Sequence, residues 1–397
     1  MYMADYKQIT PHRQIRLECE NSNSSATHRK RVEWVDTLKV LTLIGVVLMH
    51  SSYYTIHSSF GGVENLPADV GERSFLYRAF AVIIGGISRF AMPLFMAASG
   101  AVFSWSMGKF STLSTLIHNK AKRLLMPFLW VMTFVSVPIK YLAGYWDHST
   151  HVLSDILCGQ YLLLGNSHLW FVVSLFYIFV VFYLLEKSNV RKNISYWGIL
   201  LGVSWLATIL YHFLGPSFGM VFGLYGLLRY LFFFAIGFST FKYWDEINLP
   251  SWSKQVLSWA GYFVISSLCF YLSGRTEILV TKAVLSFPVD SALALWGCLN
   301  MVWLARSIDC RMALKSSAIY RFMNRYNYEL YLYSEPFTYV LIAWIVSWFG
   351  QSLFTENTII TLAYVMRFSG QFFFAASVIW IVNLFKHKRI HLSVKVE

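Results

Sequence analysis

Residues 79–104 read AFAVIIGGISRFAMPLFMAASGAVFS and carry one charged side chain, Arg89. About 20 consecutive apolar residues are enough to cross the hydrocarbon core of a bilayer as a helix. The stretch therefore predicts a transmembrane helix. Pro93 predicts a kink within it, because proline cannot donate the helical hydrogen bond. Ser99 and Gly100 are small enough to let a second helix approach closely.

Nine further apolar stretches resemble this one, so the sequence predicts an all-α, polytopic membrane helix bundle of about ten transmembrane helices. The whole chain is 56% hydrophobic and 13% charged, where a soluble protein has about 25% charged residues. The predicted spans are 37–55, 79–104, 124–144, 168–186, 194–213, 219–241, 255–273, 283–305, 330–349 and 359–384. A weaker apolar segment, 152–164, is expected to form an interfacial or re-entrant helix.

The basic residues predict the orientation of the bundle. The net charge is +13, and most of the basic side chains fall in alternate loops. These residues are Arg29, Lys30, Arg31, Lys109, Lys120, Lys122, Arg123, Lys187, Arg191, Lys192, Lys242, Arg306, Arg311, Lys315, Arg321, Arg325, Lys386, Lys388 and Arg389. Because cytoplasmic loops of membrane proteins are enriched in Lys and Arg, we expect both termini in the cytoplasm. Such clusters between apolar spans indicate topology and do not favour a nucleic-acid partner.

The predicted organisation is one membrane domain between two tails. Residues 1–32 are polar and predict a flexible cytosolic tail, residues 33–385 form the membrane domain, and residues 386–397 form a second cytosolic tail. The residues near Met1 lack the short apolar core of a signal peptide, so we do not expect one. The cysteines are scattered and include no CxxC pair, so we expect neither a metal site nor a disulfide framework. They are Cys19, Cys158, Cys269, Cys298 and Cys310.

Lys39 and His50 are ionisable residues inside the first predicted span. They are 11 residues apart, so both lie on one helix face, separated by a rise of about 16 Å. Asp36 shares this face and is placed to pair with Lys39. An ionisable group inside a membrane span is costly and usually has a function. Alternatively, Lys39 extends to the interface and His50 bonds a neighbouring helix; the spacing alone favours neither interpretation.

Four more ionisable residues lie in predicted spans: Arg89, Asp290, Glu335 and Arg367. Glu335 directly precedes Pro336 and needs a partner, for which Arg89 and Arg367 are both candidates. A structural ion pair is the commoner explanation for such residues. His168, which opens the fourth span in the segment HLWF, is expected to belong to an interfacial aromatic belt. The functional alternative is a rim that stacks a sugar or a lipid-linked acceptor.

Four segments together resemble the membrane-bound acyltransferase-3 family of bacterial envelope acyltransferases. Residues 35–51 (VDTLKVLTLIGVVLMHS) have the family's spacing of a basic residue, ten residues and a histidine. Residues 89–100 (RFAMPLFMAASG) resemble its R-x3-P-L-F-x3-S-G pattern. Residues 122–128 (KRLLMPF) resemble the opening of its third span, and residues 168–171 (HLWF) resemble its H-L-W-F segment. The resemblance extends over residues 33 to 385.

The resemblance implies transfer of an acyl group, most often acetyl, from cytosolic acyl-CoA to hydroxyls of envelope glycans. His50 would be the catalytic histidine, Lys39 its basic partner near the donor, and Arg89 part of the conserved core. The basic residue is Lys39 where family members more often have arginine, so a bidentate phosphate clamp is lost. The late Y-L-x-H segment reads Tyr331-Leu332-Tyr333-Ser334, which removes a second histidine; Glu335, the next residue, either substitutes for it or has a different role.

The expected mechanism starts with acetyl-CoA held by Lys39, Lys122 and Arg123. His50 then acts as general base on the acceptor hydroxyl, or as a nucleophile that takes the acyl group. Glu335 or Asp36 would orient the imidazole, and Arg89 would stabilise the oxyanion.

The expected partners are the bilayer of the inner or plasma membrane, acyl-CoA, and a polysaccharide or lipid-linked glycan acceptor. The main alternative is a glycan exporter or flippase, which would also have broken helices and intramembrane charges. A structural or sensory membrane protein is the third possibility, and the four family-like segments speak against it.

Overall fold

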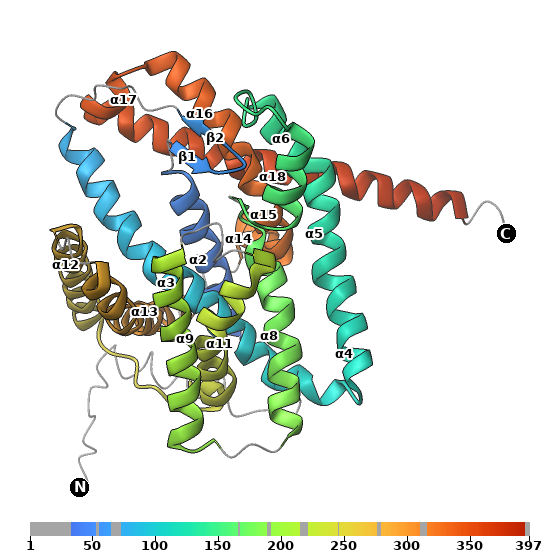
Figure 1. The fold of residues 1–397 in the computed structure, drawn as a ribbon, viewed down its shortest axis with the longest axis vertical. Coiled ribbons are helices and arrows are strands. Elements are labelled where there is room, and N and C mark those ends of the chain that lie inside the picture. Colours follow the sequence, from blue (N-terminus) through green and yellow to red (C-terminus); the bar gives the residue numbers. More distant parts are fainter. Residues whose placement is uncertain are drawn as a thin grey trace, which may run out of the picture.

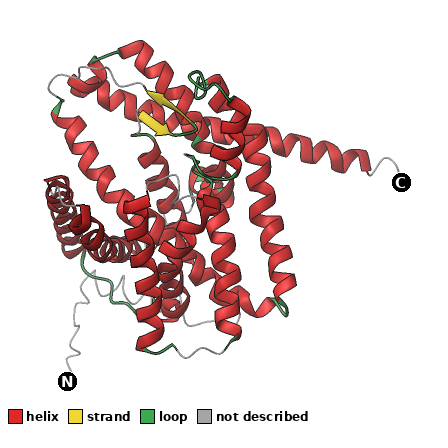
Figure 2. Ribbon diagram, viewed as in Figure 1, coloured by secondary structure: helices red, strands yellow, loops and turns green. Residues whose placement is uncertain are grey.

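The computed structural model describes residues 33–52, 55–64, 73–165, 167–188, 192–214, 221–244, 246–275, 279–309 and 316–393. They form a bundle of helices with one small hairpin, which confirms the predicted polytopic helical bundle (Figures 1 and 2). The predicted tail 1–32 and residues 394–397 lie outside the described residues. Helix α18 continues to Ser393, through most of the segment expected to be the second tail.

The helices follow one another along the chain with short connections. They are α2 (Glu33–His50), α3 (Phe75–Ser106), α4 (Leu113–Lys120), α5 (Met126–Val131), α6 (Val137–Leu142), α7 (Val152–Ile156), α8 (Trp170–Lys187), α9 (Ile194–Leu214), α11 (Leu224–Thr240), α12 (Trp252–Arg275), α13 (Leu279–Asp309), α14 (Ala318–Arg325), α15 (Asn327–Ser334), α16 (Pro336–Phe349), α17 (Ser352–Thr355) and α18 (Asn357–Ser393). Tight 3₁₀ turns are η1 (Met107–Lys109), η5 (Val221–Gly223) and η6 (Phe241–Tyr243), and wide π turns are η2 (Ala121–Leu125), η3 (Met132–Ser136) and η4 (Leu157–Tyr161).

Seven of the described helical segments are long and apolar enough to cross a membrane. They are Phe75–Lys109, Leu113–Leu142, Trp170–Lys187, Ile194–Leu214, Trp252–Leu272, Val280–Asp309 and Asn357–Phe385. The other three predicted spans also fall on helices. Helices α11 and α16 are apolar but shorter, and α2 carries Glu33, Asp36 and Lys39 among its 18 residues.

Helices α3 and α11 pack so closely that their backbones touch. A Cβ atom added to Gly100 would collide with the backbone of Phe234, and one added to Gly237 would collide with that of Ala97. Two glycines on facing helices therefore allow the contact, as small residues do in membrane bundles. The close approach predicted for the Ser99-Gly100 segment is confirmed.

The segment from α4 to α6 is one continuous helix interrupted by two π turns. Pro127 follows η2 and Pro138 follows η3, each near the first turn of the next α-helical piece. Proline has no N–H and its ring crowds the preceding turn, so a wider turn accommodates it without ending the helix. Lys140 is carried into the bundle interior by the last of these pieces.

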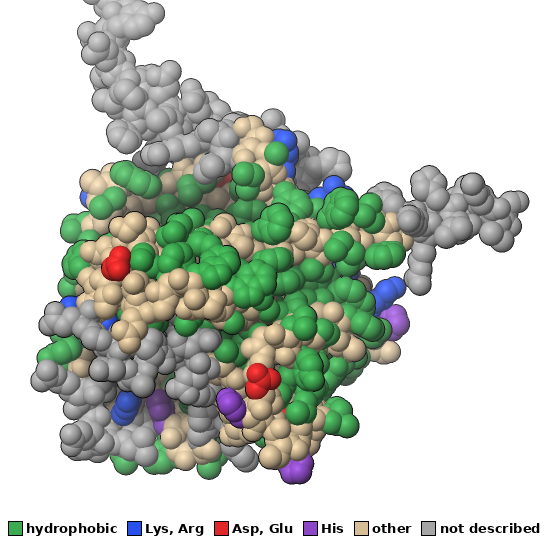
Figure 3. Space-filling model, turned by 90° about the horizontal axis from the view of Figure 1, so that it is seen from above, with side chains coloured by type: hydrophobic (Ala, Val, Ile, Leu, Met, Phe, Trp, Pro, Cys, Tyr) green, Lys and Arg blue, Asp and Glu red, His purple; other side chains and the backbone are tan. Residues whose placement is uncertain are grey.

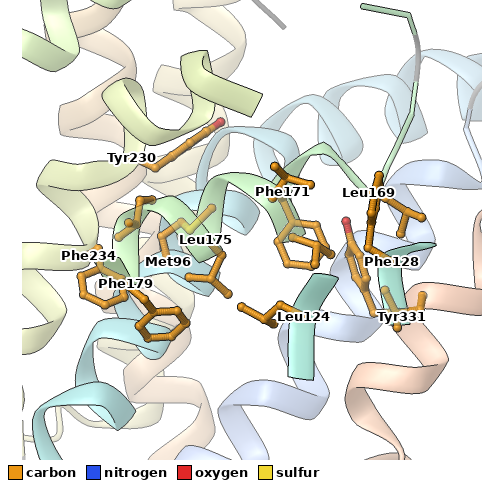
Figure 4. Packing of buried hydrophobic residues seen from close by; sticks show 14 of the residues in the cluster. Met96, Leu124, Phe128, Leu169, Phe171, Leu175, Phe179, Tyr230, Phe234 and Tyr331 are labelled. Atoms are coloured by element: carbon orange, nitrogen blue, oxygen red, sulfur yellow. The ribbon is translucent and has the colours of Figure 1, made fainter. Parts of the chain in front are cut away.

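Aromatic and aliphatic side chains fill the centre of the bundle (Figure 4). Large hydrophobic side chains are also exposed on the outer helices, among them Phe134 on η3, Leu257 on α12 and Phe373 on α18, at 66%, 74% and 68%. Figure 3 shows hydrophobic side chains over much of the face seen from above, with scattered charged ones. Apolar surface on this scale is stable when lipid surrounds it.

A hairpin follows α2. Strands β1 (Thr55–Ser58) and β2 (Gly61–Glu64) pair antiparallel, and Gly62 N–H donates to the Tyr145 carbonyl at 2.9 Å. Gly61 has a φ of +121°, a region that favours glycine, and a Cβ there would meet the Tyr145 ring. The hairpin was not predicted. The segment 152–164, expected to be a short helix, contains α7 and η4.

Candidate active site

His50 is the last residue of α2, and its side chain is buried. The fully buried Arg367 of α18 donates from Nη2 to the His50 carbonyl at 3.3 Å. One turn further along α18, Gln371 donates to the hydroxyl of Ser51 at 2.9 Å. A guanidinium at the C-terminus of a helix satisfies carbonyls that have no intrahelical donor and opposes the negative end of the helix dipole. Helix α18 thereby fixes the position of His50.

His168 lies just before α8 and faces His50. The two imidazole rings are perpendicular, with an interplanar angle of 81° and centroids 6.4 Å apart. The His168 side chain is 1% exposed, so the expectation of an interfacial belt at this residue is wrong. Its backbone carbonyl accepts a hydrogen bond from the Tyr331 hydroxyl at 3.0 Å. Hydropathy does not distinguish a histidine at a membrane surface from one buried between helices.

Glu335 sits at the junction between α15 and α16 and is the ionic partner of His168. The Nδ1 to Oε2 distance is 2.7 Å, although the contact is not aligned as a hydrogen bond. The other carboxylate oxygen accepts a hydrogen bond from the Tyr339 hydroxyl at 3.0 Å. The structure thus pairs Glu335 with His168, and not with Arg89 or Arg367 as the sequence led us to consider.

The helix break at Pro336 supplies a hydrogen-bond acceptor for His168. Proline has no N–H, so the Leu332 carbonyl, four residues earlier, has no donor from the next turn. His168 Nε2 lies 3.1 Å from that carbonyl. Because a carbonyl only accepts, Nε2 must carry a hydrogen. His168 therefore has one nitrogen on the Leu332 carbonyl and the other on Glu335, and neither is open to a substrate.

Lys140 adds a buried positive charge next to Glu335. It is fully buried and donates to Gln160 Oε1 at 2.8 Å. Its ammonium also lies over the rings of Tyr145 and Tyr339, 4.9 Å and 4.8 Å from their centroids. The Glu335 carboxylate is close enough to interact electrostatically with both Lys140 and His50. The site therefore balances one carboxylate against a lysine and two imidazoles.

The hairpin and the segment after α6 cover this cluster. The Trp146 indole donates to the Phe60 carbonyl at 3.0 Å, and the hydroxyls of Ser58 and Tyr145 are 3.3 Å apart. Tyr145 lies between α6 and α7, and burial raises its pKa to about 12. Its phenol is therefore protonated at neutral pH and is available as a hydrogen-bond donor.

A cavity of about 330 Å³ lies at the other end of α2. Its polar lining includes Lys39, Lys120 and Arg325, together with the carboxylates of Asp36 and Glu329. Lys39 pairs with Asp36 at 3.3 Å, as predicted, so Asp36 lies at this cavity and not beside His50. Three basic groups against two acidic ones leave the lining with one positive charge in excess.

Lys122 and Arg123, which were expected to bind the donor, do not line this cavity. Both side chains are exposed on η2. Lys120, one residue before η2, points into the cavity instead, and its ammonium lies 3.5 Å from the centre of the Phe179 ring. The basic run was located correctly along the chain, but the helical phase that selects the inward residue was not available from the sequence.

Aromatic side chains connect the cavity with the His50 cluster. Phe95 lines the cavity, and its ring centroid is 6.2 Å from that of Tyr331. Tyr331 in turn bonds the His168 carbonyl. Helix α15 also joins the two regions, since Glu329 lines the cavity and Glu335 follows the end of the helix. Both α2 and α15 thus run from the cavity to the buried cluster.

Arg89 lies in a different place from the one expected. Its Nε is 3.6 Å from Asp290 Oδ1 on α13, and within the described part of the chain no hydrogen bond or ion pair joins it to His50 or Glu335. Among the same described residues, no group of three or more His, Cys, Asp or Glu side chains is arranged to hold a metal ion. Polar groups suited to holding a co-substrate line the cavity beside Lys39, which α2 connects to His50.

Comparison with protein families gives a match over almost the whole chain. Residues 32–384 match the acyltransferase-3 family, whose description is an acyltransferase domain. The chain belongs to the acyltransferase-3 family. This acyltransferase is a multi-pass membrane protein, and the match covers every residue of the two regions described above. Comparison with curated proteins and with solved structures gives no match.

Three residues of the candidate site were missed or misjudged from the sequence. Lys140 lies inside the predicted span 124–144, so its position within an apolar run was a signal that could have identified it. His168 was assigned to an interfacial belt, although the following Leu-Trp-Phe segment marks the start of a buried helix. Lys120 was included among the loop bases but not among the donor-binding residues.

Proposed function

We propose that this membrane acyltransferase moves an acyl group, most simply acetyl, from cytosolic acyl-CoA to a hydroxyl of an envelope polysaccharide or a lipid-linked glycan. The observation that carries the proposal is the course of α2. Lys39 of this helix lies at a cavity whose lining has one positive charge in excess. His50, at the end of the same helix, lies in the buried cluster with Glu335. The rise between Lys39 and His50 is about 16 Å, a distance that an extended pantetheine arm can bridge.

Acyl-CoA is an anion, and the cavity offers the chemistry to bind its phosphates. Lys39, Lys120 and Arg325 are the basic side chains of the lining, and charge-assisted hydrogen bonds to phosphate are among the strong polar contacts. Phe95 and Tyr331 lie along the way to His50, so the arm passes beside them. Lys122 and Arg123 remain outside, where they supply general attraction for an anion at the surface.

His50 acts as the general base in the proposed reaction. It takes the proton of the acceptor hydroxyl, and the hydroxyl oxygen forms a bond to the thioester carbonyl carbon. The tetrahedral oxyanion then collapses and the carbon–sulfur bond breaks. The imidazolium gives its proton to the departing sulfur, so CoA leaves as the thiol and His50 is neutral again. His168 takes no proton in this scheme because both of its nitrogens are engaged. It positions Glu335, whose carboxylate stabilises the imidazolium of His50.

The oxyanion needs positive charge that is already in place. Lys140 and Arg367 are both fully buried, one beside Glu335 and the other on the His50 carbonyl. We assign them the stabilising role that the sequence led us to expect of Arg89. The proposed location in an inner or plasma membrane and the glycan acceptor rest on membership of the family, which acts on envelope glycans.

The test is acyl transfer in inverted membrane vesicles that contain the protein and its acceptor pool. Labelled acetyl-CoA is supplied to the wild type, to His50→Ala and to His118→Ala, a control at an exposed histidine of α4. Label should enter glycan or lipid-linked fractions with the wild type and the control, and fall by about 100-fold or more in His50→Ala. Equal labelling by a well-inserted His50→Ala protein would overturn the proposal. If no protein gives label while the acceptor pool is present, glycan transport becomes the better assignment.

A further inference from the structure

A second polar cavity, of about 240 Å³, lies between α3, α11 and α13. It shares no lining residue with the cavity beside Lys39, and none of the His50 cluster lines it. Its polar lining is Ser88, Arg89, Arg229, Tyr230, Asp290 and Ser291. Two guanidinium groups and one carboxylate therefore meet in a cavity inside the membrane-spanning segments, where charges are expensive unless they have a ligand or a partner.

The guanidinium of Arg89 is only partly satisfied by the protein. Its Nε makes a long, single contact of 3.6 Å with Asp290, and the Arg89 side chain is 15% exposed. The Nη1 atom is buried and, among the described residues, has no hydrogen-bond partner. A buried donor without a partner costs about 1–3 kcal/mol, so the protein alone leaves this site incomplete.

Arg229 lines the same cavity and shares its nearby carboxylate, Asp290, with Arg89. It donates to the Tyr225 hydroxyl, and its guanidinium lies 5.5 Å and 5.7 Å from the ring centroids of Tyr225 and Tyr230. Stacking on aromatic rings orients a guanidinium but supplies no counter-ion. The forked donors of an arginine match the oxygens of carboxylate and phosphate groups.

Positive charge also surrounds the cavity. His212 on α9 interacts electrostatically with Arg229, Lys282 and Asp290, so these four groups lie near one another. Its ring nitrogen is 3.1 Å from the Ser286 hydroxyl. Asp290 is the carboxylate that lines the cavity, and it interacts with both Arg89 and Arg229. An anionic ligand would restore the balance.

We propose that this cavity binds the oxyanion group, a phosphate or carboxylate, of an amphiphilic molecule that enters from the membrane. Arg89 is the fifteenth residue of the 32-residue helix α3, about 21 Å from its first residue, so the cavity lies near the middle of this helix along its length. Exposed apolar side chains flank it: Leu228, Val289 and Leu295 are exposed by 39%, 40% and 39%. The cavity holds the charge, and this apolar surface accommodates the chain.

The site does not depend on the proposed transferase reaction. Tyr230, in its wall, stacks on Trp170 with ring centroids 5.7 Å apart, and Trp170 follows His168 by two residues. The two regions are therefore neighbours, but binding at one can be measured without turnover at the other.

The experiment measures ligand-dependent thermal stabilisation of the purified, full-length protein in detergent. The probes are phosphatidic acid, diacylglycerol with the same chains, and inorganic phosphate. A ligand that binds the folded state raises the unfolding midpoint. Phosphatidic acid should stabilise the wild type, and diacylglycerol should not. Equal effects of these two lipids would overturn the proposal. Stabilisation by inorganic phosphate at similar concentration would show that the oxyanion alone is sufficient and that no lipid chain is needed.

Variants locate the effect. Arg229→Gln should weaken the apparent affinity for phosphatidic acid about tenfold, because it removes a charged donor pair. Asp290→Asn should strengthen it, because it removes the competing carboxylate. Arg78→Gln is the control, since Arg78 is at the outer part of α3 and its side chain donates only to the Arg73 carbonyl among the described residues. Unchanged affinity in Arg229→Gln overturns the proposal. Should Arg229→Gln fail to fold, weaker binding of phosphatidic acid by Asp290→Asn would also overturn the proposal.

Discussion

The imidazole of His168 donates from Nε2 to the carbonyl of Leu332 over 3.1 Å. This carbonyl lacks its usual helical donor because Pro336 stands four residues later. A sequence feature that breaks one helix thus supplies the acceptor that orients a histidine from another. Since the other nitrogen of His168 faces Glu335 at 2.7 Å, the break fixes the geometry of the pair beside His50.

Replacing Pro336 by alanine should lower acyl transfer without unfolding the protein. The new N–H would bond the Leu332 carbonyl within the helix and displace His168. We expect kcat to fall about tenfold and the KM for acyl-CoA to stay the same, because the donor cavity is at the other end of α15. Steady-state transfer kinetics measure both quantities. Pro250→Ala, in the loop before α12, is the control; a change in KM alone would contradict the prediction.

The pair of His168 and Glu335 should behave as one unit. We expect His168→Gln and Glu335→Gln each to reduce kcat by about 100-fold, and the double variant to be little worse than either one. The measurement is a double-mutant cycle on kcat, with an expected coupling of more than about 1 kcal/mol. Additive losses would mean that the 2.7 Å contact carries no functional coupling.

Lys140→Met should reduce both stability and activity. The substitution leaves the buried Gln160 oxygen without its donor and removes a cation near Glu335. A buried acceptor without a partner costs about 1–3 kcal/mol. Thermal unfolding in detergent should show a lower midpoint than the wild type. Lys192→Met is a suitable comparison, because the partly exposed pair of Lys192 with Glu186 contributes about 0–1 kcal/mol. A midpoint equal to that of the comparison would refute the role of Lys140.

Two pairs of lysine and arginine variants should separate the donor-binding residues from the general surface charge. Lys39→Ala and Lys120→Ala should each raise the KM for acyl-CoA about tenfold, because each removes a charged group from the cavity lining. Lys122→Ala and Arg123→Ala, on the exposed face of η2, should change it less than about twofold. Direct binding of acyl-CoA to the purified variants should show the same ranking, with the weakest affinities in Lys39→Ala and Lys120→Ala. The reverse order would move the donor site to the surface.

Two Gly→Ala substitutions should have opposite effects. Gly237→Ala would push a Cβ into the backbone of Ala97 and should destabilise the α3–α11 contact by about 1–3 kcal/mol or more. A Cβ added to Gly202 of α9 would have no described atom within 4 Å, so Gly202→Ala should be neutral or stabilising by about 0.5–1 kcal/mol. The yield of monodisperse protein after solubilisation reports the difference. Equal yields would mean that the helices have room to separate.

The apolar spans were predictable because each depends on local composition. Lipid requires about 20 apolar residues wherever a helix crosses, so residues 79–104 and their counterparts were recognised without knowledge of their neighbours. His50 and Glu335 were also singled out, since an ionisable group in an apolar run is conspicuous, and the structure buries both in one cluster. The hairpin at 55–64 was missed because it is held by Tyr145 and Trp146, which are far away in the chain.

Local composition is enough to specify a membrane helix bundle and the charged residues that lie within its spans. The partners of these residues follow from the packing of the helices. His168 meets Glu335, Arg89 meets Asp290, and Lys120 replaces Lys122 at the cavity beside Lys39. The physical reason is that a span's apolar content depends on each residue alone, whereas a pairing depends on the rotation, depth and contacts of two helices, and many packed side chains set these together.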